Sequence, residues 1–143
     1  MGRRTPESSL EEIFRRAVEA LADEDGQGEV VAESLRYLQQ GFDAHYAKNG
    51  GGATDNDILV GDNAYAWAVE TIARLDEPRF VAVASRMIRD GAGRISAGEN
   101  VPLELWIPHL ADLLRIISGE DSEASEVRIR RSADQLQTEG RDS

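Results

Sequence analysis

The stretch DNDILVGDNAYAWAVETIARL, residues 55–75, is the most apolar long helix candidate in the chain. Its apolar side chains recur at a period of about 3.6 residues, which is typical of an amphipathic helix with a wide buried face. Either Thr54 or Asp55 can cap this helix, and it is expected to end just before the run Asp76-Glu77-Pro78. We therefore expect the other helices to pack around it, at the centre of the fold.

The rest of the chain shows helical periodicity and no strand pattern. Ser8 with Glu11, or Ser9 with Glu12, forms a capping box that opens a first helix. Further helices are expected over residues 29–46, 76–97 and 103–117, with at most a weak one over residues 126–137. Because no stretch alternates apolar and polar residues strictly, we predict an all-α helical bundle of about five helices with a polar C-terminal tail.

Three places in these segments carry residues that affect where a helix begins, ends or bends. Asp76 is expected to cap the fourth helix. Gly91 and Gly93 then indicate either an early stop or a place where a neighbouring helix presses close, and we favour a helix that continues to about residue 97. In the fifth helix, Pro108 predicts a kink or a split into two pieces.

Length and composition limit the classes of protein to consider. A chain of 143 residues can bury about two thirds of its unfolded surface, and we expect a helical domain over residues 1–118 with an acidic tail or weak terminal helix over 119–143. The absence of cysteine excludes disulfides and thiolate chemistry and favours a reducing, cytoplasmic location. No apolar run reaches the about 18 residues of a membrane span. A net charge of −11 argues against nucleic-acid and anionic-membrane surfaces.

Potential metal ligands cluster around the glycine run at residues 50–52. The members of this cluster are Asp43, His45, Asp55, Asp57 and Asp62. Because carboxylate and imidazole groups hold divalent cations, Asp43, His45 and Asp62 are the candidate metal ligands. The alternative interpretation is that these are polar residues at helix ends, since Asp43 and His45 are two residues apart and do not share a helical face.

Large apolar residues are candidates for a subunit interface. The segment 103–117 is apolar on more than one face, which suggests a contact with another subunit as well as with its own chain. The expected interface residues are Trp67, Trp106, Leu110 and Leu114. The two tryptophans are alternatively core residues or ring surfaces that stack on a ligand. We expect a protein partner, either a different subunit or a second copy of the chain.

Two short motifs resemble a known family. Residues 40–45 (QGFDAH) and 58–66 (ILVGDNAYA) are similar to a carboxylate-bearing helix and the following Leu-x-Gly-Asp helix of the all-helical trans-polyprenyl diphosphate synthase superfamily. They are most similar to its small, non-catalytic partner subunits, as in the first component of two-component heptaprenyl diphosphate synthases. Residues 95–99 (ISAGE) resemble the end of the family's next helix. The resemblance covers about residues 35–99 and implies part of an isoprenoid synthase fold.

The resemblance also implies roles for single residues. Gly61 would be a close-packing glycine at the helix start, Asp62 the polar residue beside it, and Asp43 the remnant of a metal-carboxylate position. Tyr46 and Ala47 stand where a second aspartate would fall, and the arginine pair that usually follows is missing. Since magnesium-held diphosphate needs several convergent carboxylates, the resemblance implies a chain that is not catalytic alone. No cofactor is expected, and Mg²⁺ would enter only with a catalytic partner subunit.

Three hypotheses for function follow. The first is a non-catalytic helical subunit of a heteromeric polyprenyl diphosphate synthase in isoprenoid biosynthesis, which acts on product length through its shape. The second is a small metal- or phosphate-handling enzyme that uses Asp43, His45 and Asp62. The third is a homo-oligomeric helical protein without a ligand.

Overall fold

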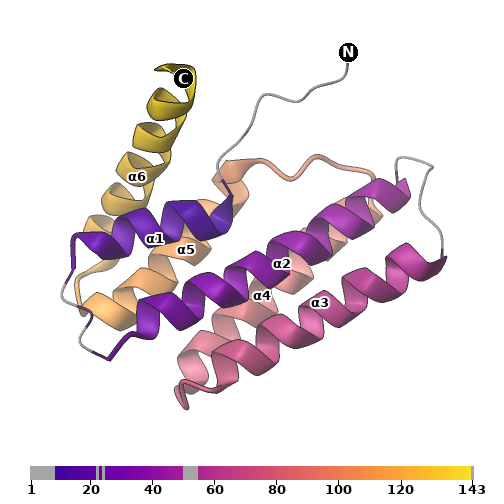
Figure 1. Ribbon diagram of the computed structural model, residues 1–143, viewed down its shortest axis with the longest axis horizontal. Coiled ribbons are helices and arrows are strands. Elements are labelled where there is room, and N and C mark those ends of the chain that lie inside the picture. The colour runs from indigo at the N-terminus through magenta and orange to yellow at the C-terminus, as the bar shows by residue number, and fades with distance from the viewer. Residues whose placement is uncertain (1–8, 22, 24, 50–54, 143) are drawn as a thin grey trace.

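The computed structural model describes residues 9–21, 23, 25–49 and 55–142, and all regular structure among them is α-helical. The helices are α1 (Leu10–Glu19), α2 (Gln27–Asn49), α3 (Asp55–Ala73), α4 (Pro78–Ser96), α5 (Leu103–Ser118) and α6 (Ser122–Asp142) (Figure 1). The all-α prediction is confirmed, and the described residues form six helices, one more than the sequence indicated. None of these helices has both the length and the apolar character that a bilayer crossing requires.

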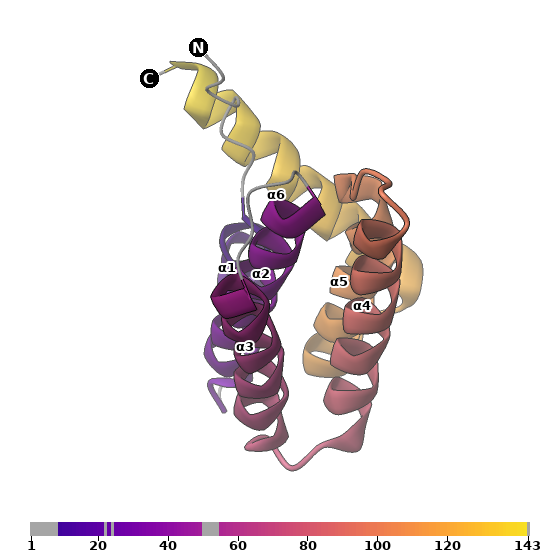
Figure 2. The ribbon, with the colours of Figure 1, turned by 90° about the vertical axis from the view of Figure 1, so that its right-hand side faces the viewer.

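The helices pack in two layers, with α1, α2 and α3 facing α4 and α5 (Figure 2). Helix α2 contacts α1, α3, α4 and α5, and α5 contacts α1, α2, α4 and α6. Helix α3, by contrast, contacts only α2 and α4 among the described helices. The expectation that residues 55–75 form the centre of the fold is therefore wrong. The centre is formed by α2 and α5.

The burial of α3 explains why its apolar sequence was misleading. Its buried apolar side chains are Ala64, Ala68 and Ile72, of which two are alanines. Leu59 and Trp67, by contrast, are exposed. The apolar residues are distributed around the helix and only one side of it meets the bundle, so its high apolar content does not correspond to a wide buried face.

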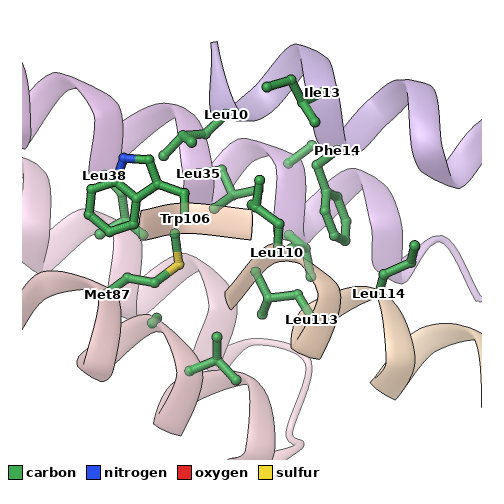
Figure 3. Packing of buried hydrophobic residues seen from close by; sticks show 14 of the residues in the cluster. Leu10, Ile13, Phe14, Leu35, Leu38, Met87, Trp106, Leu110, Leu113 and Leu114 are labelled. Carbon is green, nitrogen blue, oxygen red and sulfur yellow. The ribbon is translucent and has the colours of Figure 1, made fainter. Parts of the chain in front are cut away.

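The core lies between the two layers and extends under α6. Figure 3 shows part of it, with side chains from α1, α2, α4 and α5 in contact. Its largest fully buried side chains are Phe14, Phe80, Ile13, Leu35, Leu38, Ile72, Met87, Ile107, Leu110, Leu113, Leu114 and Ile129. Pro108 lies inside α5, which runs as one helix from Leu103 to Ser118 rather than as two pieces.

Helix α6 is longer and more firmly packed than the sequence indicated. Where an acidic tail or weak helix was expected from residue 119, Ile129 and Ala133 are buried against the bundle. Ser125 and Ser132 are buried on the same face, so two of its inward positions are polar and weaken the apolar pattern. Arg130 donates to both carboxylate oxygens of Glu104 on α5, at 2.8 and 3.0 Å, and these hydrogen bonds hold the pKa of Glu104 below its usual value.

Helix ends follow the expected capping chemistry, with one correction. Of the two possible capping boxes, the structure uses Ser9, whose hydroxyl accepts from the Glu12 N–H at 3.1 Å. Helix α4 is capped by Glu77, whose carboxylate accepts from the Arg79 N–H at 3.0 Å. The expected cap, Asp76, instead has a φ of 54° after the last turn of α3, a left-handed conformation that aspartate tolerates better than most residues. Thr54 lies outside the described residues.

The glycines of α4 have different environments. The helix continues through Gly91 and Gly93 to Ser96, as favoured from the sequence. A Cβ added at Gly91 would lie 2.6 Å from Trp106 Cη2 and 2.9 Å from Phe42 Cζ, whereas one at Gly93 meets no atom within 4 Å. Gly91 is therefore the position where neighbouring helices press close, and Gly93 is not.

Candidate functional site

The most exposed apolar side chains of the described residues gather on α3. Leu59, Val60 and Trp67 keep 58%, 51% and 50% of their surface exposed. Their exposure places them on the part of the helix surface that the rest of the bundle leaves uncovered. We define the outer face of α3 by the exposed residues Leu59, Val60, Asn63, Ala66, Trp67, Glu70 and Ala73; Asp62 is also exposed but meets His45 and is not included.

Two α2 side chains extend this face. The ring of Tyr37 lies 6.5 Å from that of Trp67, and the guanidinium of Arg36 lies 5.2 Å from the centre of the Tyr37 ring. Tryptophan, tyrosine and arginine are the residue types that most often dominate binding energy at protein interfaces. The outer face of α3 thus combines exposed apolar area with anchor residues of the right chemical types.

The expected interface residues are separated by the fold. Trp67 is exposed, whereas Trp106, Leu110 and Leu114 keep 5%, 0% and 0% of their surface exposed. These three side chains lie in the core of the same chain, between α5 and the layer that faces it (Figure 3). Of the four expected interface residues, Trp67 is therefore the one that is exposed enough to contact a partner.

The candidate metal ligands are brought together only in part. His45 Nε2 on α2 lies 3.1 Å from Asp62 Oδ1 on α3. The Asp43 carboxylate instead accepts from Gln39 Nε2 at 3.3 Å and lines a separate cavity. Among the described residues no group of three or more His, Cys, Asp or Glu side chains is arranged to hold a metal ion. The glycine run 50–52 and the side chains of residues 55 and 57 lie outside the described part.

Gly61 allows the contact between His45 and α3. A Cβ at this position would lie 2.7 Å from His45 Cδ2 and 3.3 Å from the Ala44 Cβ. The glycine therefore lets the imidazole lie directly against the backbone of α3, where it reaches Asp62. This is the close-packing position that the sequence resemblance implied for Gly61.

A column of aromatic rings connects this pair to the core. The rings are, in order, those of His45, Tyr65, Phe42, Trp106 and His109. His45 and Tyr65 are parallel with centroids 5.2 Å apart, and Phe42 and Trp106 stack at 4.7 Å. At the far end His109 Nε2 lies 2.9 Å from Asp90 Oδ2. Tyr65 and Trp106 thus stack on rings of their own chain.

The Tyr65 hydroxyl provides a test of this column. Its oxygen is buried without a hydrogen-bond partner among the described residues, and burial is the main cause that raises the pKa of the Tyr65 side chain. Tyr65→Phe is therefore expected to raise the free energy of unfolding by about 1 kcal/mol at pH 7, measured by urea titration. Because the folded pKa is raised, wild-type stability falls as pH rises above the unfolded value of about 10, and the variant should lose less stability there. A clear destabilisation at pH 7 would contradict this.

A cavity of about 570 Å³ opens between α1, α2, α5, α6 and the connection from α4 to α5. Its lining residues are Ser9, Leu10, Ile13, Gln39, Phe42, Asp43, Ile95, Asn100, Val101, Pro102, Leu103, Trp106, Ala133 and Gln137. Sequence reasoning missed this site because the lining comes from segments far apart in the chain. Among the lining residues, the sequence singles out Asp43 alone as a candidate metal ligand, in a group with His45.

A second hollow, of about 580 Å³, is lined by charged residues of both signs. Arg86 and Arg115 lie 3.6 and 3.8 Å from the two carboxylate oxygens of Asp112 between them. Glu120 and Asp121 also line it. Since its arginines are matched by carboxylates, this hollow has no charge preference that would select a ligand.

Comparisons with known proteins identify no relative of this chain. No protein-family model, no curated protein and no solved structure matches the chain.

Proposed function

We propose that this chain is a non-catalytic helical interaction subunit that binds a partner protein through the outer face of α3. The partner that the sequence resemblance favours is a catalytic subunit of a polyprenyl diphosphate synthase, whose product length the small subunit would influence through its shape. The observation that carries the proposal is the exposure of Leu59, Val60 and Trp67 on one side of a helix that contacts only two others.

Three of the four large apolar side chains that are exposed among the described residues lie on α3. Single exposed leucines or valines are common on protein surfaces, but a contiguous apolar face more often marks an interaction site. Burial of each large side chain of this kind contributes about 1.5–3 kcal/mol. The neighbouring Tyr37 and Arg36 supply anchors of the types that concentrate binding energy.

The placement of the two motifs supports the choice of partner class. The motif at residues 40–45 lies on α2 and the one at 58–66 lies on α3, and they touch through Phe42, Tyr65 and the His45–Asp62 pair. The two longer motifs therefore lie on one helix pair, and the outer face of α3 belongs to that pair. A partner that recognises the motif-bearing helices would meet this face.

The proposal is tested by mixing the purified chain with a catalytic polyprenyl diphosphate synthase subunit. We expect a complex by size-exclusion chromatography with light scattering and a changed product chain length. Leu59→Glu should weaken the complex more than about tenfold, because it places a charge on the most exposed apolar position of the contact. The matched control is Val127→Glu on α6, where a similarly exposed apolar residue (48%) lies outside the proposed face and should have no effect.

Two outcomes would contradict the proposal. One is the absence of a complex together with unchanged product length. The other is a dimer of the chain alone that Leu59→Glu dissociates while no mixed complex forms. In that case the outer face of α3 is a contact between copies, and the homo-oligomer hypothesis replaces the subunit hypothesis.

A further inference from the structure

We propose that the cavity between α1, α2, α5 and α6 binds a small organic cation, namely an amine that carries an apolar body. This inference is independent of the interaction function of α3, because none of the residues on the outer face of α3 lines the cavity. It rests on three observations: the size and apolar floor of the cavity, the carboxylate that is the one charge among its described lining residues, and the aromatic pair in its wall.

The size and floor of the cavity are those of a small-molecule site. A volume of about 570 Å³ lies within the range of about 300–1,000 Å³ that is typical of ligand pockets. Leu10, Ile13 and Ile95 form apolar parts of the lining and are themselves buried, so they belong to the fixed core of the bundle. A ligand without an apolar portion would leave this floor uncovered.

The polar groups gather where the lining meets solvent, and they select for positive charge. Among the described residues of the lining, Asp43 is the only charged one, and Gln39, Asn100 and Gln137 add side-chain carbonyl oxygens. No arginine, lysine or histidine among the described residues forms an ion pair with Asp43. An ammonium group satisfies a carboxylate and several carbonyl acceptors at once, whereas an anion would be repelled by Asp43.

Gln39 holds the carboxylate in place. Its Oε1 accepts from the Leu10 N–H at 3.4 Å, in the first turn of α1, and its Nε2 donates to Asp43 Oδ1 at 3.3 Å. This chain of hydrogen bonds fixes one oxygen of Asp43 and leaves Oδ2 as an acceptor. A carboxylate oriented in this way loses less side-chain entropy on binding than a freely rotating one.

The wall contains the stacked rings of Phe42 and Trp106, whose centroids are 4.7 Å apart. Because the two rings stack on each other, their contribution to the wall is apolar contact with the hydrocarbon body of a ligand. The net charge of −11 adds a long-range attraction for cations and repulsion for anions. All three features point to the same ligand class.

The inference is tested by isothermal titration calorimetry of the full chain with phenylbutylamine, phenylbutanol and phenylbutyrate. These probes share one body and differ in charge, so the amine is expected to bind most tightly and the carboxylate most weakly. Asp43→Asn should weaken binding of the amine about fivefold, as expected for a solvent-accessible charge pair, and leave binding of the alcohol unchanged. Asp134→Asn is the matched control, since Asp134 is an exposed aspartate outside the lining, and it should change neither affinity.

A second variant tests the location of binding independently of charge. Ala133 is buried on α6 and lines the cavity, so Ala133→Leu places additional volume inside it and should abolish binding of both amine and alcohol. The inference is overturned if no probe binds saturably at millimolar concentration, if the alcohol binds as tightly as the amine, or if Asp43→Asn and Asp134→Asn have equal effects. Unchanged binding by a folded Ala133→Leu variant would overturn it as well.

Discussion

Leu110→Ala is expected to lower the free energy of unfolding by about 2–5 kcal/mol, the largest effect on stability that we predict for a single substitution. Leu110 is fully buried on α5, the helix that contacts α1, α2, α4 and α6. Removing its side chain loses apolar burial and leaves a cavity that neighbours on several helices would have to fill together. Urea unfolding followed by circular dichroism at several protein concentrations measures the change.

Leu59→Ala is the matched control for this substitution. The same atoms are removed from a leucine that is mostly exposed on α3, so the expected change is within about 0.5 kcal/mol. A small effect at Leu110 that grows with protein concentration would contradict the packing described for α5. It would instead support the sequence-based expectation that Leu110 lies at a subunit interface.

Gly91→Ala is expected to lower the free energy of unfolding by about 1–3 kcal/mol, because its methyl group overpacks the contact with Phe42 and Trp106. Both aromatic side chains are buried and stacked on each other, so neither ring can move aside without disturbing its own packing. This cost has to exceed the gain in helix propensity of about 1 kcal/mol that alanine brings. The measurement is again urea unfolding.

Gly93→Ala, two residues along the same helix, separates these two effects. A Cβ at Gly93 meets no atom within 4 Å, so only the helix-propensity gain remains and stability should rise by about 0.5–1 kcal/mol. Opposite signs for the two substitutions are the expected result. A stabilisation by Gly91→Ala would show that α4 does not approach the rings as closely as described.

The positions of the helices could be predicted because the signals for them are local. Capping residues such as Ser9, glycine breaks and the period of apolar residues act within a few positions of the chain. The first five predicted helices overlap the observed ones, and only details at their ends, such as the cap at Glu77, differ. Packing order could not be predicted in the same way, because burial depends on which neighbours a helix meets.

In helices α3 and α6 the observed burial differs from what their sequences indicate, in opposite directions. The apolar content of α3 placed it at the centre, yet it lies at the edge with Trp67 exposed. The polar content of α6 made it a tail, yet Ile129 and the small residues Ser125 and Ser132 let it pack closely. Small polar side chains are compatible with close helix contacts, but they do not register as apolar positions in a periodicity count.

The candidate sites were predictable to different degrees. His45 and Asp62 are named together from the sequence as candidate metal ligands, and the structure brings these two side chains within hydrogen-bond distance. Asp43 was grouped with them through sequence proximity, but it lies two residues from His45 and meets Gln39 at the cavity instead. The cavity could not be predicted, since its walls come from helices that are distant in sequence.

Because one tryptophan is exposed and the other is buried, the intrinsic fluorescence of the chain reports on its surface and on its core. A small neutral quencher such as acrylamide reaches the indole on α3 directly, while the one stacked on Phe42 is shielded until the bundle opens. Fluorescence from a single unlabelled sample therefore distinguishes coverage of the α3 surface from loss of tertiary structure. A partner that docks there should protect the first indole without altering the second.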